Sequence, residues 1–461
     1  MSGTPVAGIP TDGEIAVLGL ARSGRAVSLL LASRGHSVYV SDSSSSPALD
    51  TTVAELVGHG VAAEASGHDL ARIGRAALVV VSPGIPPTAT PLASAREHGV
   101  PVVSEIEVAL HMLGRARVVA VTGTNGKSTT TAMIGSILDD LAGDAAVAGN
   151  IGLPLSEVAL LERPPAWIAL ELSSFQLHDT PSLVPDVGVL TNLSPDHLDR
   201  YAGVKEYYAD KALLFRNASG GSTWVSNSDD ADSARMTAGV DGRHVRFSLA
   251  RRADAWLDQD AGMLRLGDHE LMPRSELPLL GKHNVANALA AALAVSVADD
   301  AFRGDDARAR IARALRNFKP LSHRLELLGE FRGVHWINDS KATNVGATLV
   351  ALQAMERPTI LLLGGRHKGE RYVPLAGEIR RTVKHVIAYG EAGPLIAAEL
   401  RAVADVRTSA GPFEEVIAEA RGRAAPGDAV LLSPACSSYD MFANYEERGE
   451  RFREVVAAAG G

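Results

Sequence analysis

Cysteine is nearly absent from this sequence of 461 residues, which contains only Cys436. A single cysteine cannot form an intramolecular disulfide, so we expect a protein of a reducing compartment, the cytoplasm. Residues 1–11 lack the positively charged and then apolar stretch of a secretory signal, and we expect none. The longest apolar runs, such as Ala77–Val81 and Thr359–Leu363, have the length of strands, whereas a membrane helix needs about 20 residues. The sequence therefore predicts no membrane insertion.

An excess of positive charge is also missing. The net charge of −9 argues against DNA, RNA or a membrane surface as partners. Any anionic substrate must then be held by local basic side chains. A hydrophobic content of 46% and a charged content of 21% are typical of a folded protein. At this length, the chain is expected to form about three domains.

Short runs of leucine and β-branched residues alternate with Ala-rich amphipathic stretches along the whole chain. This alternation is typical of βαβ units and parallel sheets, so we predict an α/β fold. We place the domains at 1–104, 105–319 and 320–461: Rossmann-like, P-loop-type ATPase and Rossmann-like. Residues 217–232 and 243–272 are expected to form loops or small antiparallel additions. Other predicted elements include the strands Ile15–Gly19, Leu78–Ser82, Arg117–Val121, Trp167–Leu170, Val187–Leu190 and Ala429–Leu432, and the helix Asp305–Asn317.

The strongest motif lies where the predicted strand Arg117–Val121 runs into a glycine loop and a helix start. The loop reads Gly123-Thr124-Asn125-Gly126-Lys127-Ser128-Thr129. Glycines let backbone N–H groups converge on phosphate oxygens, and the helix N-terminus favours an anion. Lys127 is expected to reach the β- and γ-phosphates of ATP and Ser128 to bind Mg²⁺. Val121 stands where the full motif has its first glycine, so we interpret the loop as a shorter variant.

A second glycine turn, Gly19-Leu20-Ala21-Arg22-Ser23-Gly24, lies near the N-terminus between a predicted strand and a helix. It is similar to a dinucleotide fingerprint whose middle glycine is replaced by Ala21. The alanine hinders close approach of a pyrophosphate, so NAD is disfavoured, while a nucleotide or anion remains open, as does a purely structural turn. Asp42 ends the next predicted strand, and Gly84 follows a later one.

Polar residues also follow the predicted strands of the middle domain. Glu171 ends the strand that begins at Trp167, and His197 lies in the loop after Val187–Leu190. The carboxyl ends of neighbouring parallel strands meet at one sheet edge, so these side chains and the glycine loop are expected to share a metal and phosphate site. Asn150 follows another predicted strand, as a binding residue or as part of a turn. Lys211 lies on a predicted helix and by itself indicates only a solvated lysine.

These segments together resemble the Mur ligase family, and within it the MurD type. The resemblance covers the chain from Gly19 to Gly449. The motifs GTNGKSTT, GNIGLP, DHLDRY and GKHNVAN begin at Gly123, Gly149, Asp196 and Gly281, and His323-Arg324 is a further match. Three segments indicate the MurD type: ELSSFQL, NDSKATN and SPACSSYDMFANYEERG, which begin at Glu171, Asn338 and Ser433.

The resemblance implies an ATP-dependent ligase that adds D-glutamate to UDP-N-acetylmuramoyl-L-alanine through an acyl phosphate, in cytoplasmic peptidoglycan precursor synthesis. Cell-wall formation, cell shape and cell division would depend on it. We expect a monomer whose partners are these small molecules, with ATP and two Mg²⁺ ions. Lys211 matches a lysine that relatives carry as a carbamate. We interpret Cys436 as a small buried side chain.

The roles that the resemblance implies fall into five sets. Catalysis would involve Lys127, His197 and Lys211, and the metal ligands would be Ser128, Glu171, His197 and Lys211. ATP would be bound by residues 123–129 and by Asn150, Asn284, Asn287, Arg324, Asp339 and Lys341. The UDP substrate would contact Ser23, Gly24, Asp42 and Gly84, and D-glutamate would contact Thr343, Lys368, Ser438 and Tyr445.

Three other functions stay open at this point. Another amide ligase of the family would add a different amino acid or extend folate. A nucleotide-binding regulator or switch ATPase would keep the glycine loop but would not need the polar motifs of the third domain. A nicotinamide dehydrogenase would use Gly19–Gly24, but Ala21 weakens that motif and the ATP loop would have no role.

Overall fold

The computed structural model describes residues 8–196 and 200–460. The chain divides into two compact units, one of Met1–Glu276 with Ala286–Arg316 and one of Leu277–Val285 with Asn317–Gly461. The first unit contains two sheets and the second contains one. The division at 104 and 319 into three domains stays a prediction. No helix within the described ranges is both long and apolar enough to cross a membrane.

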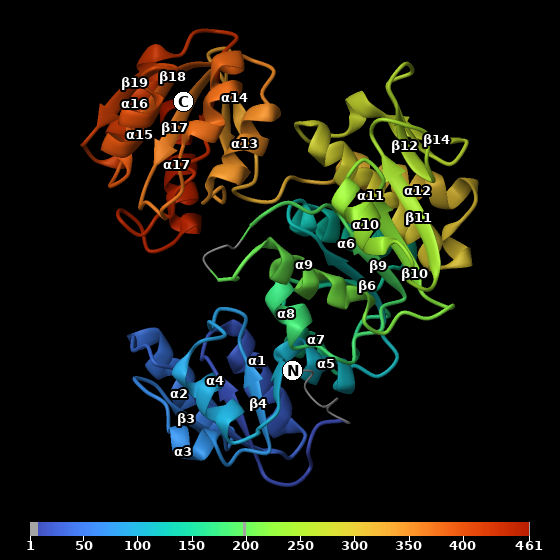
Figure 1. Cartoon of the computed structure of the whole chain (residues 1–461). Coiled ribbons are helices and arrows are strands. Elements are labelled where there is room, and N and C mark those ends of the chain that lie inside the picture. The colour runs from blue at the N-terminus through green and yellow to red at the C-terminus, as the bar shows by residue number, and fades with distance from the viewer. Residues whose placement is uncertain (1–7, 197–199, 461) are drawn as a thin grey trace. The chain divides into compact units, whose positions relative to one another are not determined.

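The N-terminal sheet has the strand order β3-β2-β1-β4-β5, and all its pairings are parallel. Its elements, which run from blue to teal in Figure 1, are β1 (Glu14–Leu18), α1 (Arg22–Ser33), β2 (Ser37–Ser41), α2 (Pro47–Gly58), β3 (Ala62–Glu64), α3 (Leu70–Ile73), β4 (Leu78–Val81), α4 (Thr90–Glu97), β5 (Val102–Ser104) and α5 (Glu105–Met112). Side chains of α1, α2 and α5 pack on one face, and those of α3 and α4 pack on the other. The strands are apolar runs because both faces are covered. The order reverses between β1 and β4, where such sheets bind ligands.

The central sheet has nine strands in the order β14-β13-β12-β11-β10-β9-β6-β8-β7. Its strands are β6 (Arg117–Thr122), β7 (Ala145–Gly149), β8 (Trp167–Glu171), β9 (Val187–Leu190), β10 (Thr223–Asn227), β11 (Arg243–Ser248), β12 (Ala255–Asp258), β13 (Met263–Leu266) and β14 (His269–Pro273). The helices are α6 (Lys127–Ala142), α7 (Leu155–Ala159), α8 (Ser174–His178), α9 (Val204–Ala212), α10 (Ala231–Thr237), α11 (Lys282–Ala298) and α12 (Asp305–Asn317). Strand β6, which precedes the phosphate loop, pairs in parallel with β8 and β9.

The expectation for residues 217–232 and 243–272 was only partly right. Strands β13 and β14 form the predicted antiparallel addition. Strands β11 and β10 are instead parallel members of the main sheet: β11 pairs with β10 and β12, and β10 also pairs with β9. Strand β10 has the weaker local pattern. Its five residues, TWVSN, have only a short apolar stretch. Trp224 and Val225 are nevertheless buried, because neighbouring strands and helices cover them, which no local pattern encodes.

The third sheet has the order β15-β16-β20-β17-β18-β19. It is parallel except for the hairpin of β15 with β16. Its elements, in orange and red in Figure 1, are β15 (Glu326–Phe331), β16 (Val334–Asn338), α13 (Val345–Gln353), β17 (Thr359–Gly364), α14 (Ala376–Thr382), β18 (Val383–Tyr389), α15 (Gly393–Leu400), β19 (Asp405–Ser409), α16 (Phe413–Arg423), β20 (Ala429–Leu432) and α17 (Tyr445–Gly460). Helices α13, α14 and α15 cover one face, and α16 and α17 cover the other.

Candidate active site

The first glycine turn closes tightly on itself. Gly19 has a φ of +98°, and a Cβ built on Gly24 would lie 1.8 Å from the carbonyl oxygen of Gly19. Glycine at this position lets helix α1 begin directly against the turn. The Asp42 carboxylate accepts hydrogen bonds from the backbone N–H of Leu20 at 3.0 Å and of Ser44 at 2.8 Å. Asp42 therefore shapes the turn through its side chain, a role that the motif did not predict.

The predicted UDP-substrate residues lie at one edge of the N-terminal sheet. Ser23 and Gly24 follow β1, Asp42 follows β2, and Gly84 follows β4. The motif search missed Ser82, which lies at the same edge. Its hydroxyl is buried without a hydrogen-bond partner among the described residues, and it lies 2.8 Å from where a Cβ on Gly19 would stand. Only the burial and the lack of a partner mark this serine.

The phosphate loop opens helix α6 as predicted. Gly123 and Gly126 have φ values of +142° and +80°, which glycine adopts without strain. The Lys127 ammonium group donates to the carbonyl oxygens of Gly123 at 3.0 Å and of Thr124 at 2.8 Å. The amine is thus held over the loop that precedes it, and Ser128 is buried at the helix start.

Glu171 is a buried carboxylate at the end of β8, only 1% exposed. Its Oε1 accepts a hydrogen bond of 2.9 Å from Asn150 Nδ2. Its Oε2 is buried and has no hydrogen-bond partner within the described ranges. A buried carboxylate oxygen without a partner is costly, so this atom fits a ligand position for a cation. Because β6 and β8 are neighbours, Glu171 and the phosphate loop lie at the same sheet edge, as predicted.

Lys211, on helix α9, is not the solvated lysine that its surroundings in the sequence suggested. The side chain is 1% exposed, and its ammonium group lies 4.8 Å from the ring centre of Tyr207. Burial, and secondly the charge of Lys127, hold the pKa of Lys211 well below its usual value. The charges of Asp196 and Glu171 oppose that shift. The structure thus brings Lys211, Lys127 and Glu171 into one electrostatic neighbourhood.

Only some of the predicted metal ligands belong to the residues that the structure describes. His197 lies outside the described residues. Within the described part of the chain, no group of three or more His, Cys, Asp and Glu side chains is placed to hold a metal ion. The remaining predicted ligands are Ser128, Glu171 and Lys211, of which Glu171 alone carries a carboxylate.

Asn284 and Asn287, both predicted to bind ATP, fall in different units. Asn287 lies against the phosphate loop, since a Cβ on Gly126 would stand 2.3 Å from its Oδ1. The Thr130 hydroxyl donates to the same Oδ1 at 3.3 Å. Asn284 belongs to the second unit, where its Nδ2 donates to the carbonyl oxygen of Leu280 at 2.8 Å.

In the third sheet, the predicted residues follow three neighbouring strands. Asp339, Lys341 and Thr343 come after β16, Ser438 after β20 and Lys368 after β17. The segments after β17 and β20 are joined by a 2.9 Å hydrogen bond from the backbone N–H of Arg366 to the carbonyl oxygen of Ser437. Because these strands are adjacent and parallel, the segments share one edge of the sheet.

Lys341 and Tyr445, predicted for different ligands, are direct partners. The ammonium group donates to the phenol oxygen at 2.6 Å and lies 4.4 Å from the ring centre. Asp339 lies two residues before Lys341, and its carboxylate accepts from the Ser433 hydroxyl at 2.8 Å. Burial raises the pKa of Asp339 to about 7.

Arg448, which the motif comparison did not single out, organises the same edge. Its guanidinium is fully buried and donates to the Ser340 hydroxyl at 2.9 Å and to the carbonyl oxygen of Cys436 at 3.2 Å. Paired in this way, a buried arginine crosslinks the segments after β16 and β20. Cys436 is buried, as predicted, and burial raises the pKa of its thiol to about 11.

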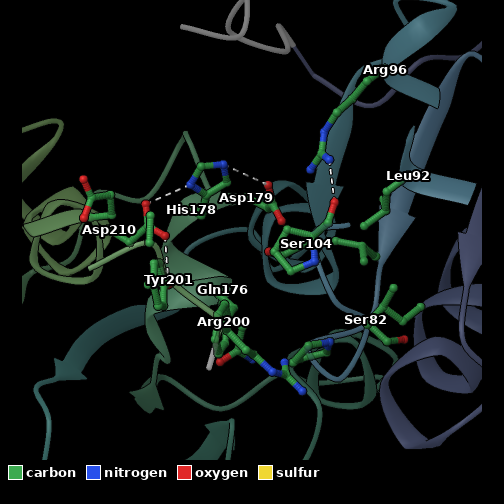
Figure 2. Close-up of a pocket in the computed structure, with 17 residues that line it drawn as sticks. Ser82, Leu92, Arg96, Ser104, Gln176, His178, Asp179, Arg200, Tyr201 and Asp210 are labelled. Atoms are coloured by element: carbon green, nitrogen blue, oxygen red, sulfur yellow. Dashed lines mark hydrogen bonds and ion pairs between the residues drawn. The ribbon is translucent and has the colours of Figure 1, made fainter. Parts of the chain in front are cut away.

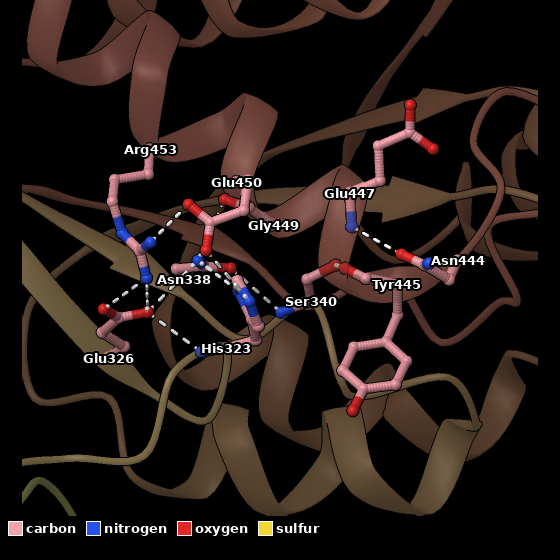
Figure 3. Close-up of polar contacts among 10 residues, drawn as sticks. All are labelled: His323, Glu326, Asn338, Ser340, Asn444, Tyr445, Glu447, Gly449, Glu450 and Arg453. Atoms are coloured by element: carbon pink, nitrogen blue, oxygen red, sulfur yellow. Dashed lines mark hydrogen bonds and ion pairs between the residues drawn. The ribbon is translucent and has the colours of Figure 1, made fainter. Parts of the chain in front are cut away.

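His323, which precedes Arg324 in the chain, belongs to a cluster of polar contacts near the start of β15 (Figure 3). The buried Asn338 donates to His323 Nδ1 at 3.0 Å and to the carbonyl oxygen of Gly449 at 3.2 Å. Arg453 binds the Glu326 carboxylate at 2.8 Å, and this carboxylate accepts from the backbone N–H of His323. The cluster fixes the backbone on both sides of Arg324.

A cavity of about 290 Å³ lies within the first unit, between the segments after β4 and helices α8 and α9 (Figure 2). Its apolar wall includes Leu92, and His178 on its polar wall pairs with Asp210 at 2.9 Å. Tyr201 donates to the same carboxylate at 2.9 Å. Asp179 also lines the cavity, and burial raises the pKa of its carboxyl to about 6. Sequence reasoning identified none of these residues as lining a cavity.

The site defines a class of protein: an enzyme that binds the phosphates of a nucleotide at the edge of a parallel sheet. Its defining parts are the phosphate loop, the Glu171 Oε2 atom without a partner among the described residues and the buried Lys211. Comparison with known proteins narrows that class. Three family models match the chain: the Mur ligase MurD-like N-terminal domain over residues 13–104, the Mur ligase middle domain over 121–295 and the Mur ligase glutamate ligase domain over 323–436.

Two relatives match almost the whole length of the chain. The chain is 40% identical over 453 residues to the UDP-N-acetylmuramoylalanine--D-glutamate ligase of Pelotomaculum thermopropionicum, covering 97% of this chain and 98% of that protein. It is 39% identical over 451 residues to the ligase of the same name from Acidobacterium capsulatum, covering 96% of each. The chain therefore belongs to the Mur ligase family, which is a family of ATP-dependent ligases.

Solved structures show the same fold at low identity. The UDP-N-acetylmuramate-alanine ligase of Thermotoga maritima aligns with a TM-score of 0.62 at 20% identity, covering 97% of this chain and 100% of its own. A pseudomurein peptide ligase type C from Methanothermus fervidus aligns with a TM-score of 0.60, also at 20% identity and with the same coverage. The predicted three-part α/β architecture is confirmed.

Proposed function

We propose that this chain joins D-glutamate to UDP-N-acetylmuramoyl-L-alanine, with ATP converted to ADP and phosphate, in peptidoglycan precursor synthesis. The observation that carries the reaction type is the buried Glu171 carboxylate, with one oxygen lacking a partner, beside the phosphate loop and Lys211. The names of the full-length relatives support the choice of substrates. We place the enzyme in the cytoplasm and expect a monomer.

The reaction has two steps. A carboxylate is a poor acyl donor, so the L-alanyl carboxylate first attacks the γ-phosphorus of ATP, and ADP leaves. The amine of D-glutamate then attacks the acyl phosphate, phosphate leaves, and the amine loses a proton. Two anions must meet in the first step, so positive charge and backbone N–H dipoles are required at the transferring phosphoryl group. Lys127 supplies the charge, and the start of helix α6 supplies the dipoles.

Mg²⁺ fits the residues at this edge. Glu171 offers a buried carboxylate oxygen without a partner, and Ser128 lies at the start of α6, so both would hold metal, together with His197. When bound, Mg²⁺ neutralises the phosphate oxygens. Asn150 would hold the Glu171 carboxylate in place through its 2.9 Å hydrogen bond.

Lys211 completes the metal site in this proposal. Burial and the charge of Lys127 lower its pKa, which favours the neutral amine over the ammonium form. A neutral amine can add to CO₂ and release a proton, which gives a carbamate anion. The carbamate is an anion that can bind metal, and it attracts Lys127, whereas the ammonium form of Lys211 is disfavoured by burial and by the charge of Lys127.

The substrates would occupy the edges described above. Ser23, Gly24, Gly84 and Ser82 would receive the UDP portion, while Asp42 shapes the turn. The cavity next to Ser82 and Phe175 would give room to the sugar side of the donor. ATP would contact residues 123–129, Asn284, Asn287, Arg324, Asp339 and Lys341. D-glutamate would contact Thr343, Lys368, Ser438 and Tyr445, with Lys368 binding a carboxylate.

Phosphate release tests the assignment. Purified enzyme receives UDP-N-acetylmuramoyl-L-alanine, ATP, Mg²⁺ and one of D-glutamate, L-lysine or meso-diaminopimelate, and a reaction without the UDP substrate is the control. Turnover should require D-glutamate and the UDP substrate. Turnover with another of these amino acids, or none with D-glutamate, would show that the assigned acceptor is wrong.

A lysine pair tests the carbamate. Lys211→Ala should lose most activity and regain part of it when short carboxylic acids are added, while Lys205→Ala, an exposed lysine on the same helix, should stay active. In ¹³CO₂-equilibrated protein, ¹³C NMR should show a carbamate signal that Lys211→Ala lacks. Full activity of Lys211→Ala, or the same signal in that variant, would refute the carbamate at this position.

A further inference from the structure

The loop after β9 lies along the phosphate loop, and Asn192 makes the central contact. Its Oδ1 accepts from the backbone N–H of Asn125 at 3.0 Å, and its Nδ2 donates to the carbonyl oxygen of Asn125 at 2.9 Å. One carboxamide thus satisfies both backbone groups of Asn125, as a residue of a neighbouring strand does. The Thr191 hydroxyl donates to the same carbonyl oxygen at 2.7 Å.

Thr124 is held by the same loop. Its backbone N–H donates to the carbonyl oxygen of Asn192 at 2.8 Å. Its hydroxyl accepts from the backbone N–H of Ser194 and donates to the carbonyl oxygen of Ser194, both at 3.0 Å. The backbone N–H groups of Thr124 and Asn125 are therefore directed at protein atoms. The N–H groups from Gly126 onward begin helix α6, and the first N–H groups of a helix have no acceptor within it.

The loop after β9 is itself anchored to another part of the central domain. The backbone N–H of Leu193 donates to the Asp230 carboxylate at 2.6 Å. Asp230 caps helix α10, and Ser233 donates to the same carboxylate oxygen at 2.5 Å. A displacement of the phosphate loop would therefore have to break its bonds to the loop after β9, which is itself fixed to the cap of α10. Through its two hydrogen bonds, Asn192 connects Asn125 to this anchored loop.

We propose that Asn192 is a positioning residue for the nucleotide, which acts through Asn125 and restricts phosphate recognition to the N–H groups from Gly126 onward. Asn192 itself does not touch the phosphates. The inference rests on the proposed function only in taking ATP as the nucleotide, because it concerns the shape of the loop and not the amino acid that is added. Without the carboxamide, the backbone N–H of Asn125 loses its acceptor and, among the described residues, the Asn125 carbonyl keeps only the Thr191 hydroxyl as a donor. The loop then gains alternative conformations, which lower the affinity for phosphate.

The test measures ADP affinity by calorimetric titration in the presence of Mg²⁺, for wild type, Asn192→Ala, Asn192→Asp and a control. The control is Asn217→Ala, because the Asn217 carboxamide also joins two backbone groups, the carbonyl oxygens of Pro181 at 2.8 Å and Leu183 at 3.0 Å. Asn192→Ala should weaken ADP binding about tenfold or more, and Asn217→Ala should leave it unchanged. The KM for ATP should rise by the same factor, with kcat within about threefold of wild type.

Asn192→Asp keeps the size of the side chain and the acceptor for the Asn125 N–H, but it cannot donate to the Asn125 carbonyl. It should bind ADP at least as weakly as Asn192→Ala, and it also serves if the alanine variant does not fold. Wild-type ADP affinity in either folded Asn192 variant, or an equal loss in Asn217→Ala, would overturn the proposal. ADP binding needs neither D-glutamate nor the UDP substrate, so a wrong acceptor assignment would leave this result standing.

Discussion

The chain twice builds a glycine turn between a buried parallel strand and a helix, and the two turns are held by different atoms. At Gly19–Gly24, the position of a Cβ on Gly24 lies 1.8 Å from a backbone oxygen of the same turn. At Gly123–Gly126, Cβ atoms on the two glycines would meet side chains, Thr191 at 2.0 Å and Asn287 at 2.3 Å. In the first turn, Gly24 packs on the backbone of the turn itself and the Asp42 carboxylate holds Leu20, whereas both glycines of the second turn face side chains from distant segments.

The difference explains how similar motifs come to have different uses. The first turn is packed for close contact of helix and strand, and the Asp42 carboxylate is engaged in holding it. The second turn is held in shape by hydrogen bonds with Thr191 and Asn192, and the Lys127 ammonium group donates to a carbonyl oxygen of the turn. A glycine pattern therefore predicts a turn, whereas the groups that contact the turn decide what it can bind.

Removing the cation of each turn should give the largest contrast. Lys127→Met should lower kcat/KM for ATP about 10³-fold, because the charge that offsets the phosphates is lost. Arg22→Met removes an exposed guanidinium that donates to the carbonyl oxygen of Gly152 at 3.2 Å, and it should cost less than tenfold. Phosphate-release kinetics measure both. Equal losses would show that the two turns do not differ in this way.

Adding a methyl group to the first turn should cost the most stability. In Gly24→Ala the new carbon faces a backbone oxygen that cannot rotate away, so the free energy of unfolding should fall by more than about 3 kcal/mol. Gly58→Ala, at the end of helix α2 with nothing within 4 Å of the added carbon, is the matched control and should be neutral or slightly stabilising. Urea unfolding distinguishes them, and a small loss in Gly24→Ala would mean that the turn is not self-packed.

The stability of the region that packs against the first turn should also depend on pH. Helix α5 packs against α1 and α7, and its buried Glu105 accepts from the backbone N–H of Ser156 at 2.5 Å. Burial raises the pKa of Glu105 from 4.5 to about 7. The folded state therefore holds this proton more tightly, and its stabilising contribution is lost as pH rises from about 4.5 through 7.

Glu105→Gln removes this titration and keeps an acceptor for Ser156. The variant should match wild type at pH 4.5 and be more stable by up to about 3 kcal/mol at pH 8.5. Denaturant unfolding at both pH values measures the difference. The same gap at the two pH values would mean that Glu105 titrates alike in the folded and unfolded chain.

The smallest effect is expected at the carboxylate that holds the first turn. Asp42→Ala removes the acceptor for Leu20 and Ser44 and should cost about 1 kcal/mol of stability. ADP affinity should not change, because Asp42 belongs to the N-terminal sheet. A rise in KM for the UDP substrate well beyond the stability loss would show that Asp42 also contacts that substrate.

Many of the strands and helices could be predicted from local sequence patterns. The strands Val187–Leu190 and Ala429–Leu432 and the helix Asp305–Asn317 have the predicted bounds, because buried parallel strands are short apolar runs and this helix has a strong amphipathic period. Strand β10 was missed because its local pattern is weak. Lys211 could not be recognised as buried, since helix α9 is polar in sequence and only its packing removes this lysine from water.

The candidate site divides in the same way. The phosphate loop and Glu171 were found because motif residues follow predicted strands. Ser82, Asn192 and Arg448 were missed, since a serine after a strand, an asparagine in a loop and an arginine on a helix are ordinary in sequence. Each is marked only by what it contacts, or by the lack of a partner.

The sequence by itself determined three βαβ-rich domains, two glycine turns and the order of motifs that places the chain among the Mur ligases. Only the tertiary structure decided which atoms hold those turns. Hydrogen bonds such as that from Asn192 to Asn125 join residues 67 positions apart, and they form because β9 lies next to β6 in the sheet. Strand order arises from the packing of the whole domain, so local sequence does not encode these contacts.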